Sequence, residues 1–363
     1  MAQARPSSRL GGTSPRRPAP PPPTARACTF RTRAMVLKTK LTEALGIKHP
    51  IIQGGMHYVG YAEMAAAVSN AGGLGIITAF TVAQPPKGKE ALREEIQKCK
   101  KLTDKPFGVN LTLLPVGVPP DYDGIIDVCI QEGVKIMETA GRNPENVIKK
   151  LKENGIFVIH KCVSVRHAQT AARIGADFIS MDGFDCGGHP GEEDIGNWVL
   201  LAQAAQELKV PFVASGGSAT GHQLAAALAM GAEGLNMGTR FMATKEAPIH
   251  PKIKEAMVSA KVTDTTHVMR SVKNTERVYK NETAMKVREV EAEKPGDFNA
   301  IHPYVKGENY RKSFQETGDA QSSVWSCGQS IGLIKDVPTC QDLLDGLVAE
   351  AEDIIRTRLV SKL

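Results

Sequence analysis

The chain has 363 residues, enough for one large α/β domain or two smaller ones, and its 42% hydrophobic content is ordinary for a globular protein. Its formal net charge is +6, but residues 1–36 hold seven arginines and no Asp, Glu or Lys, so the remaining body is close to neutral. A neutral body that lacks an apolar run of roughly 18 residues excludes nucleic acids and membranes from the expected partners.

Residues 1–36 are rich in Arg, Pro and Ser and lack acidic residues, so they cannot bury enough surface to fold. An Arg-rich, Ser-containing and acid-poor composition is also typical of an organellar transit peptide, although the prolines at 18–23 weaken any amphipathic helix. Two interpretations stay open: a chloroplast or mitochondrial targeting segment, or an untranslated or disordered extension of a cytoplasmic protein, with Met35 as the alternative start.

From Thr39 onward one pattern repeats: a short apolar or β-branched run, a turn with glycine, and a stretch rich in Ala, Leu, Glu and Lys. Eight such runs occur: Ile51–Met56, Leu74–Ala79, Phe107–Leu114, Val134–Ala140, Ile156–Val163, Asp177–Gly183, Pro211–Gly217 and Gly234–Phe241. Their starts lie 21 to 34 residues apart, the length of one strand plus a crossover helix between parallel strands. The repeat predicts a (β/α)8 TIM barrel over residues 37–244.

Three intervening stretches carry apolar residues at helical spacing and end at a glycine: Tyr61–Ala71, His167–Ile174 and His222–Met230. Residues 245–330 break this rhythm because they are polar, charged and short of apolar periodicity. We interpret them as an insertion after the eighth strand, helical at Pro251–Ser259, that packs over the barrel mouth as a lid or as a structural cap. Residues 331–363 complete the barrel domain with a helix over 339–356.

The active site of such a barrel lies at the carboxyl ends of its strands, so the residues that follow each run are the candidates. Two of these ends are rich in glycine: Ser215, Gly216 and Gly217 after the seventh run, and Met237, Gly238 and Thr239 after the eighth. In barrels these two loops commonly bind phosphate through backbone N–H groups. We therefore expect a phosphate-bearing ligand, although glycines that only shape a tight turn would explain either loop alone.

Further candidates end the first, third, fourth and fifth runs: Gly54, Gly55, Met56, Asn110, Glu138 and Lys161. The two glycines would let a flat aromatic ligand lie against the backbone. Asn110 can both donate and accept hydrogen bonds, whereas Glu138 and Lys161 bring opposite charges to the same barrel mouth. A buried salt bridge is the structural alternative for Glu138 and Lys161.

The loop after the sixth run, residues 183–191, contains four glycines, one proline and one histidine. Asp182 ends the run, and Gly187 and Gly188 directly precede His189. Glycines let the backbone approach a ligand closely, and an imidazole titrates near neutral pH. We expect His189 to be the catalytic residue, and the alternative is a glycine-rich surface turn with a passenger histidine.

Five motifs in this order resemble the nitronate monooxygenase family, formerly called 2-nitropropane dioxygenases: Gly54-Gly55-Met56, Gly187-Gly188-His189-Pro190-Gly191, Ser215-Gly216-Gly217, Met237-Gly238-Thr239-Arg240-Phe241 and Gly328-Gln329. The resemblance covers about residues 40–356. It implies FMN, with the phosphate on the two glycine loops and the isoalloxazine near Gly54–Met56. It also implies that His189 accepts the α-proton of a nitroalkane or hydrogen-bonds the nitronate. The family oxidises the nitronate through flavin and O2 to a carbonyl compound and nitrite.

From this resemblance we assign cofactor binding to the candidate residues at the strand ends. They are Gly54, Gly55, Met56, Asn110, Glu138, Lys161, Asp182, Gly187, Gly188, Ser215, Gly216, Gly217, Met237, Gly238 and Thr239. The chain departs from the commonest family pattern in having Asp182 and Asp185, and an added carboxylate would disfavour an anionic reduced flavin. Cys186 replaces a usual alanine, and we interpret it as a space-filling neighbour. Because the seven cysteines are scattered and form no C-x-x-C pair, we expect reduced thiols and neither a disulfide framework nor a metal site.

Two other functions compete with nitronate oxidation. Related flavin barrels that share the Gly-Gly-His loop are NAD(P)H-dependent reductases of enoyl thioesters or quinones, and barrel flavoenzymes need no G-x-G-x-x-G motif to use nicotinamide. A flavin- or phosphate-binding protein without turnover is the second competitor. A homodimer stays open, since no motif specifies the oligomeric state.

Overall fold

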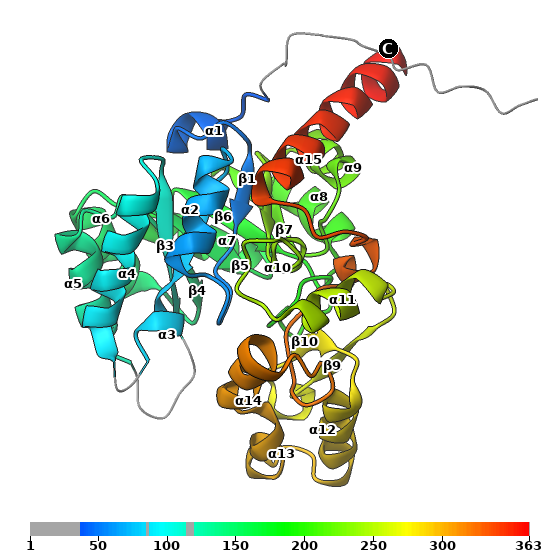
Figure 1. Ribbon diagram of the computed structural model, residues 1–363. Coiled ribbons are helices and arrows are strands. Elements are labelled where there is room, and N and C mark those ends of the chain that lie inside the picture. Colours follow the sequence, from blue (N-terminus) through cyan, green and yellow to red (C-terminus); the bar gives the residue numbers. More distant parts are fainter. Residues whose placement is uncertain (1–36, 85–86, 114–119, 363) are drawn as a thin grey trace, which may run out of the picture. The chain divides into compact units, whose positions relative to one another are not determined.

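The computed structural model describes residues 37–84, 87–113 and 120–362, which belong to one compact unit (Figure 1). Eight parallel strands follow one another around a barrel: β1 (Ile51–Gln53), β2 (Gly75–Thr78), β3 (Phe107–Leu113), β4 (Ile136–Gly141), β5 (Phe157–Cys162), β6 (Phe178–Asp182), β7 (Phe212–Ser215) and β8 (Leu235–Met237). β1 pairs with β8, and backbone hydrogen bonds of 2.9 Å between Ile51 and Leu74 and between Leu74 and Gln53 bring β2 beside β1. The predicted (β/α)8 barrel is therefore confirmed.

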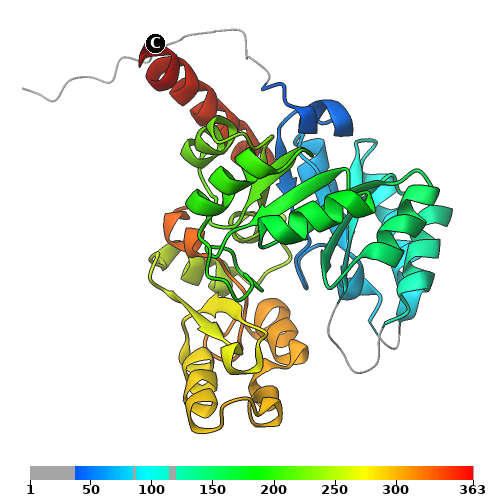
Figure 2. The same ribbon diagram turned by 180° about the vertical axis from the view of Figure 1, so that it is seen from behind.

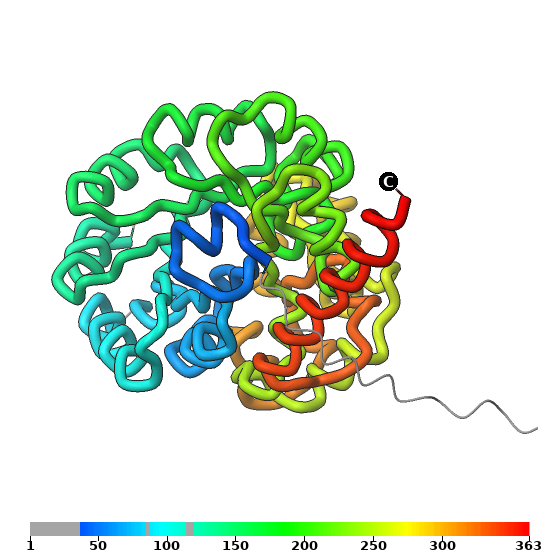
Figure 3. The backbone as a smooth tube through the Cα atoms, turned by 90° about the horizontal axis from the view of Figure 1, so that it is seen from above, coloured from blue at the N-terminus to red at the C-terminus, as the bar shows by residue number. Residues whose placement is uncertain are grey.

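Helices lie outside the ring of strands (Figures 2 and 3). They are α2 (Ala62–Asn70), α3 (Ala79–Val82), α4 (Gly88–Leu102), α5 (Tyr122–Gln131), α6 (Glu145–Glu153), α7 (Val165–Ile174), α8 (Asn197–Glu207), α9 (Gly221–Ala229) and α10 (Thr239–Met242). The three predicted helices correspond to α2, α7 and α9. Gly175 ends α7 in the left-handed conformation, as a glycine stop should. The first and eighth runs end sooner than expected, because the chain leaves the sheet after Gln53 and turns into α10 at Thr239.

One end of the barrel is closed by α1 (Lys40–Leu45), a helix that the sequence analysis did not anticipate (Figure 3). Its buried Leu41 and Leu45 meet an apolar floor inside the barrel: Ile52, Ile76, Ile136, Ile159, Phe178 and Val213. Because side chains alternate along a strand, residues two positions further toward the carboxyl end also point inward. They form a second layer above this floor.

Residues 245–330 hold more structure than their polar composition predicts. Their elements are α11 (Pro251–Ser259), β9 (Thr265–Val268), η1 (Arg270–Val272), β10 (Glu276–Tyr279), α12 (Glu282–Glu293), α13 (Phe298–Val305), α14 (Gly307–Lys312) and η2 (Ser313–Thr317). The helix expected at Pro251–Ser259 is confirmed, whereas the antiparallel pair of β9 and β10 was missed. A small core of its own holds this part together: Val268, Met269, Val278, Ala284, Val287, Ile301 and Val324. Among them, Ala284 and Val287 lie at helical spacing on α12, but the remaining residues come from separate elements and show no sustained periodicity.

The chain returns from the insertion through η3 (Gln329–Leu333) to α15 (Cys340–Ile354), which confirms the helix expected over 339–356. Glu350 on α15 accepts a hydrogen bond of 2.6 Å from the backbone N–H of Gly221 and lies 2.7 Å from His222 Nδ1 at the start of α9. The last long helix is thereby fixed to the barrel wall. No helix within residues 37–84, 87–113 and 120–362 is long and apolar enough to cross a membrane.

Trp325 joins the insertion to the main core. Its side chain is fully buried, stacks on Tyr279 with ring centroids 4.5 Å apart, and lies 5.5 Å from the ring of Phe314. Its indole N–H donates to the carbonyl of Ala320 at 3.2 Å. The other tryptophan, Trp198, is 73% exposed on α8. The two tryptophans therefore form a matched pair of buried and exposed side chains.

We expect Trp325→Ala to lower the free energy of unfolding by about 3–5 kcal/mol, because it leaves a large cavity between insertion and barrel. Trp198→Ala, the control, should change it by less than about 0.5 kcal/mol. Denaturant titration followed by circular dichroism measures both. Equal losses in the two variants would contradict the structure.

Candidate active site

The second layer inside the barrel is polar, although it is buried. Its members at the carboxyl ends of the strands are Asn110, Glu138, Ser180, Asp182, Ser215 and Asn236, each at most 7% exposed. Alternation explains the placement, since Glu138 lies two positions after Ile136 and Ser180 two positions after Phe178 of the floor. Buried polar groups are tolerated only when hydrogen-bonded, so the partners of this layer determine its arrangement.

Glu138 lies at the centre of this layer and is completely buried. Its Oε2 accepts hydrogen bonds from Gly55 N at 2.9 Å and Asn110 Nδ2 at 2.7 Å, and its Oε1 accepts one from Asn236 Nδ2 at 2.8 Å. The carboxylate thus joins the loop after β1 to strands β3 and β8. Three donors, rather than a salt bridge to Lys161, compensate its burial.

A second branch of hydrogen bonds runs from Asn236 to Lys161. Asn236 Nδ2 also lies 3.1 Å from Ser180 Oγ, which donates to Asp182 Oδ1 at 3.1 Å, and Asp182 Oδ2 lies 3.1 Å from Lys161 Nζ. Burial acts to lower the pKa of Lys161, but the carboxylates of Asp182 and Glu138 outweigh it and hold that pKa above the ordinary lysine value. The salt bridge suggested for Lys161 therefore exists, with Asp182 as its partner.

The two unusual aspartates both have partners within the protein. Asp182 is paired with Lys161, and Asp185 Oδ2 accepts a hydrogen bond of 2.9 Å from Asn197 N at the start of α8. Neither carboxylate is an isolated negative charge at the barrel mouth. Burial, followed by the charge of Asp182, raises the pKa of Cys186 to about 12, which keeps this thiol protonated.

Gly54 and Gly55 are required by the polar layer itself. A Cβ on Gly54 would lie 2.4 Å from Asn236 Oδ1, and one on Gly55 would lie 2.3 Å from Asn110 Cγ. The sequence interpretation assigned these glycines to a ligand, whereas the structure also gives them a packing role. Met56 adjoins the loop after β8, since a Cβ on Gly238 would lie 3.4 Å from its Sδ.

The glycine loops after β7 and β8 offer unpaired backbone donors. Gly216 and Gly217 have φ values of +86° and +71°, which strongly favour glycine. The backbone N–H groups of Gly216, Gly217 and Gly238 donate to no acceptor within the described part of the chain. Such a set of donors on two neighbouring strand ends fits a phosphate group. The side chain of Thr239 has another task, because its Oγ1 accepts a hydrogen bond of 2.9 Å from Gly328 N.

The loop that carries His189 is held by the insertion. Gly188 and Arg277 exchange two backbone hydrogen bonds, of 3.1 Å and 2.7 Å, so the chain just after β6 pairs with β10. His189 is exposed, and its Nδ1 lies 3.1 Å from the carbonyl oxygen of Thr275. A carbonyl only accepts, so Nδ1 carries the proton and Nε2 of the neutral ring is free to accept one.

Gly187 has a packing role in the same loop. A Cβ there would lie 2.6 Å from the backbone N of Gly328, so the glycine allows residues 327–328 to lie against the loop. Gly328 in turn bonds Thr239, as described above. The motifs that the sequence places far apart therefore meet at one end of the barrel: the loops after β1, β6, β7 and β8 and the segment at Gly328.

Sequence reasoning missed several residues of the site. Asn236 and Ser180 stand inside apolar runs, and a polar residue at an inward-facing position of a buried strand is a signal that could have singled them out. Thr275 and Arg277 could not have been found in this way. They meet the His189 loop only because β10 folds back onto it.

Comparison with known proteins gives concordant results. The family model described as nitronate monooxygenase matches residues 38–350. The chain is 35% identical over 350 residues to the Rhodococcus jostii protein named (3aS,4S,5R,7aS)-5-hydroxy-7a-methyl-1-oxo-octahydro-1H-indene-4-carboxyl-CoA dehydrogenase, a match that covers 87% of this chain and 96% of the relative. It is 31% identical to a probable nitronate monooxygenase of Staphylococcus saprophyticus, with 88% and 99% covered.

Among solved structures, FabK from Thermotoga maritima superposes with a TM-score of 0.81 at 35% identity, over 90% of this chain and 99% of that one. Similarity in sequence to these relatives, and in fold to FabK, therefore extends over nearly the whole described body. The chain belongs to the nitronate monooxygenase family and is a flavoprotein oxidoreductase.

Proposed function

We propose that the flavin is FMN and that it binds at the carboxyl end of the barrel. FMN ends in a single phosphate, and the free N–H groups of Gly216, Gly217 and Gly238 are donors of the kind that a phosphate needs. The residues proposed for the ring, Gly54–Met56, adjoin Gly238 through the side chain of Met56. The buried carboxylate of Glu138 holds the backbone of Gly55 in place beside them.

We further propose that the enzyme oxidises alkyl nitronates, such as propionate-3-nitronate, with O2 to a carbonyl compound and nitrite. The bond between His189 Nδ1 and the carbonyl of Thr275 carries this proposal, because it presents Nε2 as the acceptor. Nε2 accepts the α-proton of a nitroalkane, and the resulting imidazolium donates a hydrogen bond to the anionic nitronate. Bound FMN supplies the electron transfer between substrate and O2.

Gly238 offers a sharp test of the phosphate site. Its φ of −115° suits any residue, and a Cβ there meets only Met56 at 3.4 Å and beyond, so Gly238→Ala should fold and retain FMN. Gly238→Asp should lose FMN, because a carboxylate would meet the phosphate where donors are needed. Flavin absorbance per mole of purified protein measures both. Full flavin content in Gly238→Asp would place the phosphate elsewhere.

His189→Asn tests the proposed base. The loop is held by backbone bonds to Arg277, so FMN content and folding should be unchanged. Activity on neutral nitroalkanes should fall by roughly 10²–10⁴, the usual share of general-base catalysis, while activity on preformed nitronates should fall much less. Steady-state kinetics on the two substrate forms provides the contrast. Equal losses would mean that His189 positions the anion, and no loss would remove it from the mechanism.

A second candidate function is NAD(P)H-dependent reduction of enoyl thioesters or quinones. It is favoured by the similarity to a relative named as a CoA dehydrogenase, over 96% of that relative's length. The same exposed Nε2, once protonated, would deliver a proton to the substrate while hydride enters from the flavin.

Anaerobic mixing separates the two functions. If the enzyme oxidises nitronates, the absorbance of the oxidised flavin should persist with NADPH or NADH and be lost with propionate-3-nitronate. Prompt loss of that absorbance with NADPH, followed by recovery on addition of an enoyl thioester or a quinone, would contradict nitronate oxidation and support the reductase. Stopped-flow spectroscopy at the flavin absorbance band follows each of these additions.

A further inference from the structure

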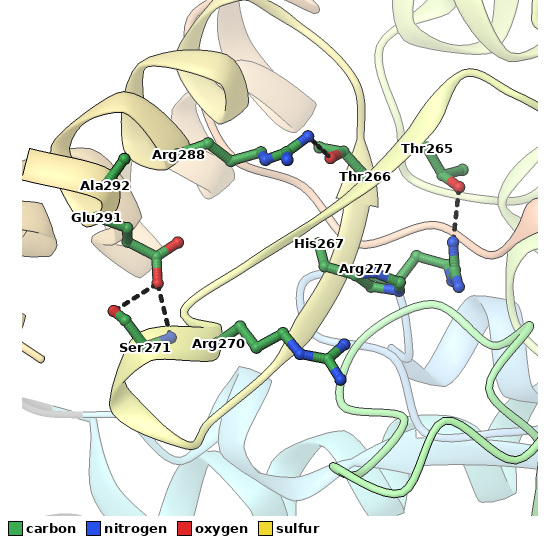
Figure 4. A pocket seen from close by; sticks show the side chains of 9 residues that line it. All are labelled: Thr265, Thr266, His267, Arg270, Ser271, Arg277, Arg288, Glu291 and Ala292. Atoms are coloured by element: carbon green, nitrogen blue, oxygen red, sulfur yellow. Dashed lines mark hydrogen bonds between the residues drawn. The ribbon is translucent and has the colours of Figure 1, made fainter. Parts of the chain in front are cut away.

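A pocket of about 410 Å³ lies in the insertion, between the two-stranded sheet and α12 (Figure 4). Its walls come from β9, η1, β10 and α12: Thr265, Thr266, His267, Arg270, Ser271, Arg277, Arg288, Glu291 and Ala292. We call it the arginine pocket. None of these residues belongs to the barrel or to the proposed FMN site.

The charges of the arginine pocket are poorly balanced by the protein. Arg277 is only 4% exposed, yet it bonds only neutral oxygens, the carbonyl of Phe184 at 2.9 and 3.1 Å and Thr265 Oγ1 at 3.0 Å. Arg288 donates to Thr266 Oγ1 at 3.0 Å. Neither arginine forms an ion pair within the described part of the chain. Arg277 is thus a buried cation whose hydrogen bonds reach no carboxylate, with Asp185 and Asp194 acting on it only at longer range, and a bound anion would offset its charge.

The one carboxylate in the pocket wall does not supply that counter-charge. Glu291 accepts hydrogen bonds from the backbone N–H of Met269 at 2.9 Å and of Ser271 at 3.1 Å, and from Ser271 Oγ at 2.8 Å. Its oxygens thus hold the turn at η1. Arg270 is paired with Asp194 through a single terminal nitrogen, so its other N–H groups stay available.

His267 adds an unused polar atom. Its Nε2 is buried and has no hydrogen-bond partner. Burial, then the charges of Arg277 and Arg270, lowers the pKa of His267 to about 4, so the ring is neutral at physiological pH. A neutral imidazole can carry its proton on Nε2 and donate it to an anion. Nε2 of His267 can therefore donate a hydrogen bond to an anion, as the surrounding arginines can.

We propose that the arginine pocket binds a phosphate monoester of a small-molecule ligand, such as the ribose phosphate that coenzyme A and NADP both carry. Three guanidinium groups with spare N–H donors suit a dianionic phosphate. The pocket volume exceeds one phosphate and leaves room for part of a nucleoside. Arg277 also pairs through its backbone with Gly188, next to His189, so the bound nucleotide lies one strand away from the catalytic loop. Nitronate oxidation needs no nucleotide other than FMN, so this site goes beyond it.

Calorimetric titration of the flavin-loaded protein with four probes tests the proposal. We expect coenzyme A to bind at least about tenfold more tightly than 3′-dephospho-coenzyme A, or NADP⁺ to bind at least about tenfold more tightly than NAD⁺, because only the first of each pair carries the extra phosphate. The pair whose two members bind with different affinity identifies the class of ligand. No discrimination within either pair would overturn the proposal.

Variants then locate the binding. Arg288→Gln should weaken the preferred probe at least about fivefold and leave folding intact, since Arg288 is exposed and, among the described residues, bonds only Thr266. Lys286→Gln is the matched control, because it removes the same charge from the same helix, outside the pocket, where Lys286 pairs with Glu289. If both variants weakened binding of the probe equally, the effect would come from the overall positive charge of the protein. That result would contradict binding in the arginine pocket.

The kinetics of nitronate oxidation give an independent readout. Arg288→Gln should oxidise propionate-3-nitronate with unchanged kcat, because Arg288 contacts none of the residues proposed for FMN or catalysis. Loss of nucleotide binding with intact nitronate turnover supports the pocket. A wild-type protein that binds nucleotide without oxidising nitronates would refute nitronate oxidation and leave the pocket standing.

Discussion

The buried carboxylate of Glu138 is the interaction on which the site depends. A charge with no exposure is tolerated only if donors surround it, and here the donors come from three different segments: Gly55, Asn110 and Asn236. Each donor also restricts its neighbours, because Asn110 and Asn236 fill the space that a Cβ on Gly55 or Gly54 would need. Charge burial, amide orientation and the two glycines thus form a single constraint on the loop that we propose for the flavin ring.

The barrel and the insertion both contribute residues to the candidate site at the carboxyl ends of the strands. Barrel strands hold Glu138, Asp182 and the glycine loops, while the insertion supplies the carbonyl of Thr275 that orients His189 and the backbone of Arg277 that pairs with its loop. The insertion is itself attached to the barrel core through Trp325. Orientation of the imidazole therefore depends on packing far from the ring. This arrangement suits a fold that keeps one cofactor site and varies its substrates through the inserted segment.

Much of this architecture could be predicted from the sequence, because the signals for strands and helices lie within short stretches of the chain. Each of the eight strands is an apolar run between turns, and the helices that follow carry their own stop signals, such as Gly175. Pairing across the chain could not be predicted. The sequence places Glu138, Lys161 and Asp182 at one mouth but does not say that Lys161 bonds Asp182 while Glu138 takes three neutral donors. Strand β10 was missed because its two fully or nearly buried residues, Val278 and Arg277, do not look alike.

Net charge also fails to predict the arginine pocket, because it carries no information on which charges meet in the fold. Residues 37–363 are close to neutral, which argues against partners that need an extended basic surface, yet three arginines converge on one pocket of the insertion. Their acidic neighbours balance only part of this charge: Glu291 holds the turn at η1, and Asp194 pairs with Arg270, which leaves Arg277 and Arg288 without an ion pair in the described part of the chain. Net charge cannot reveal these unpaired arginines, because it counts all charges equally, whether or not they are paired. The local excess of unpaired guanidinium groups, beside the loop of His189, is what a small phosphorylated ligand would meet.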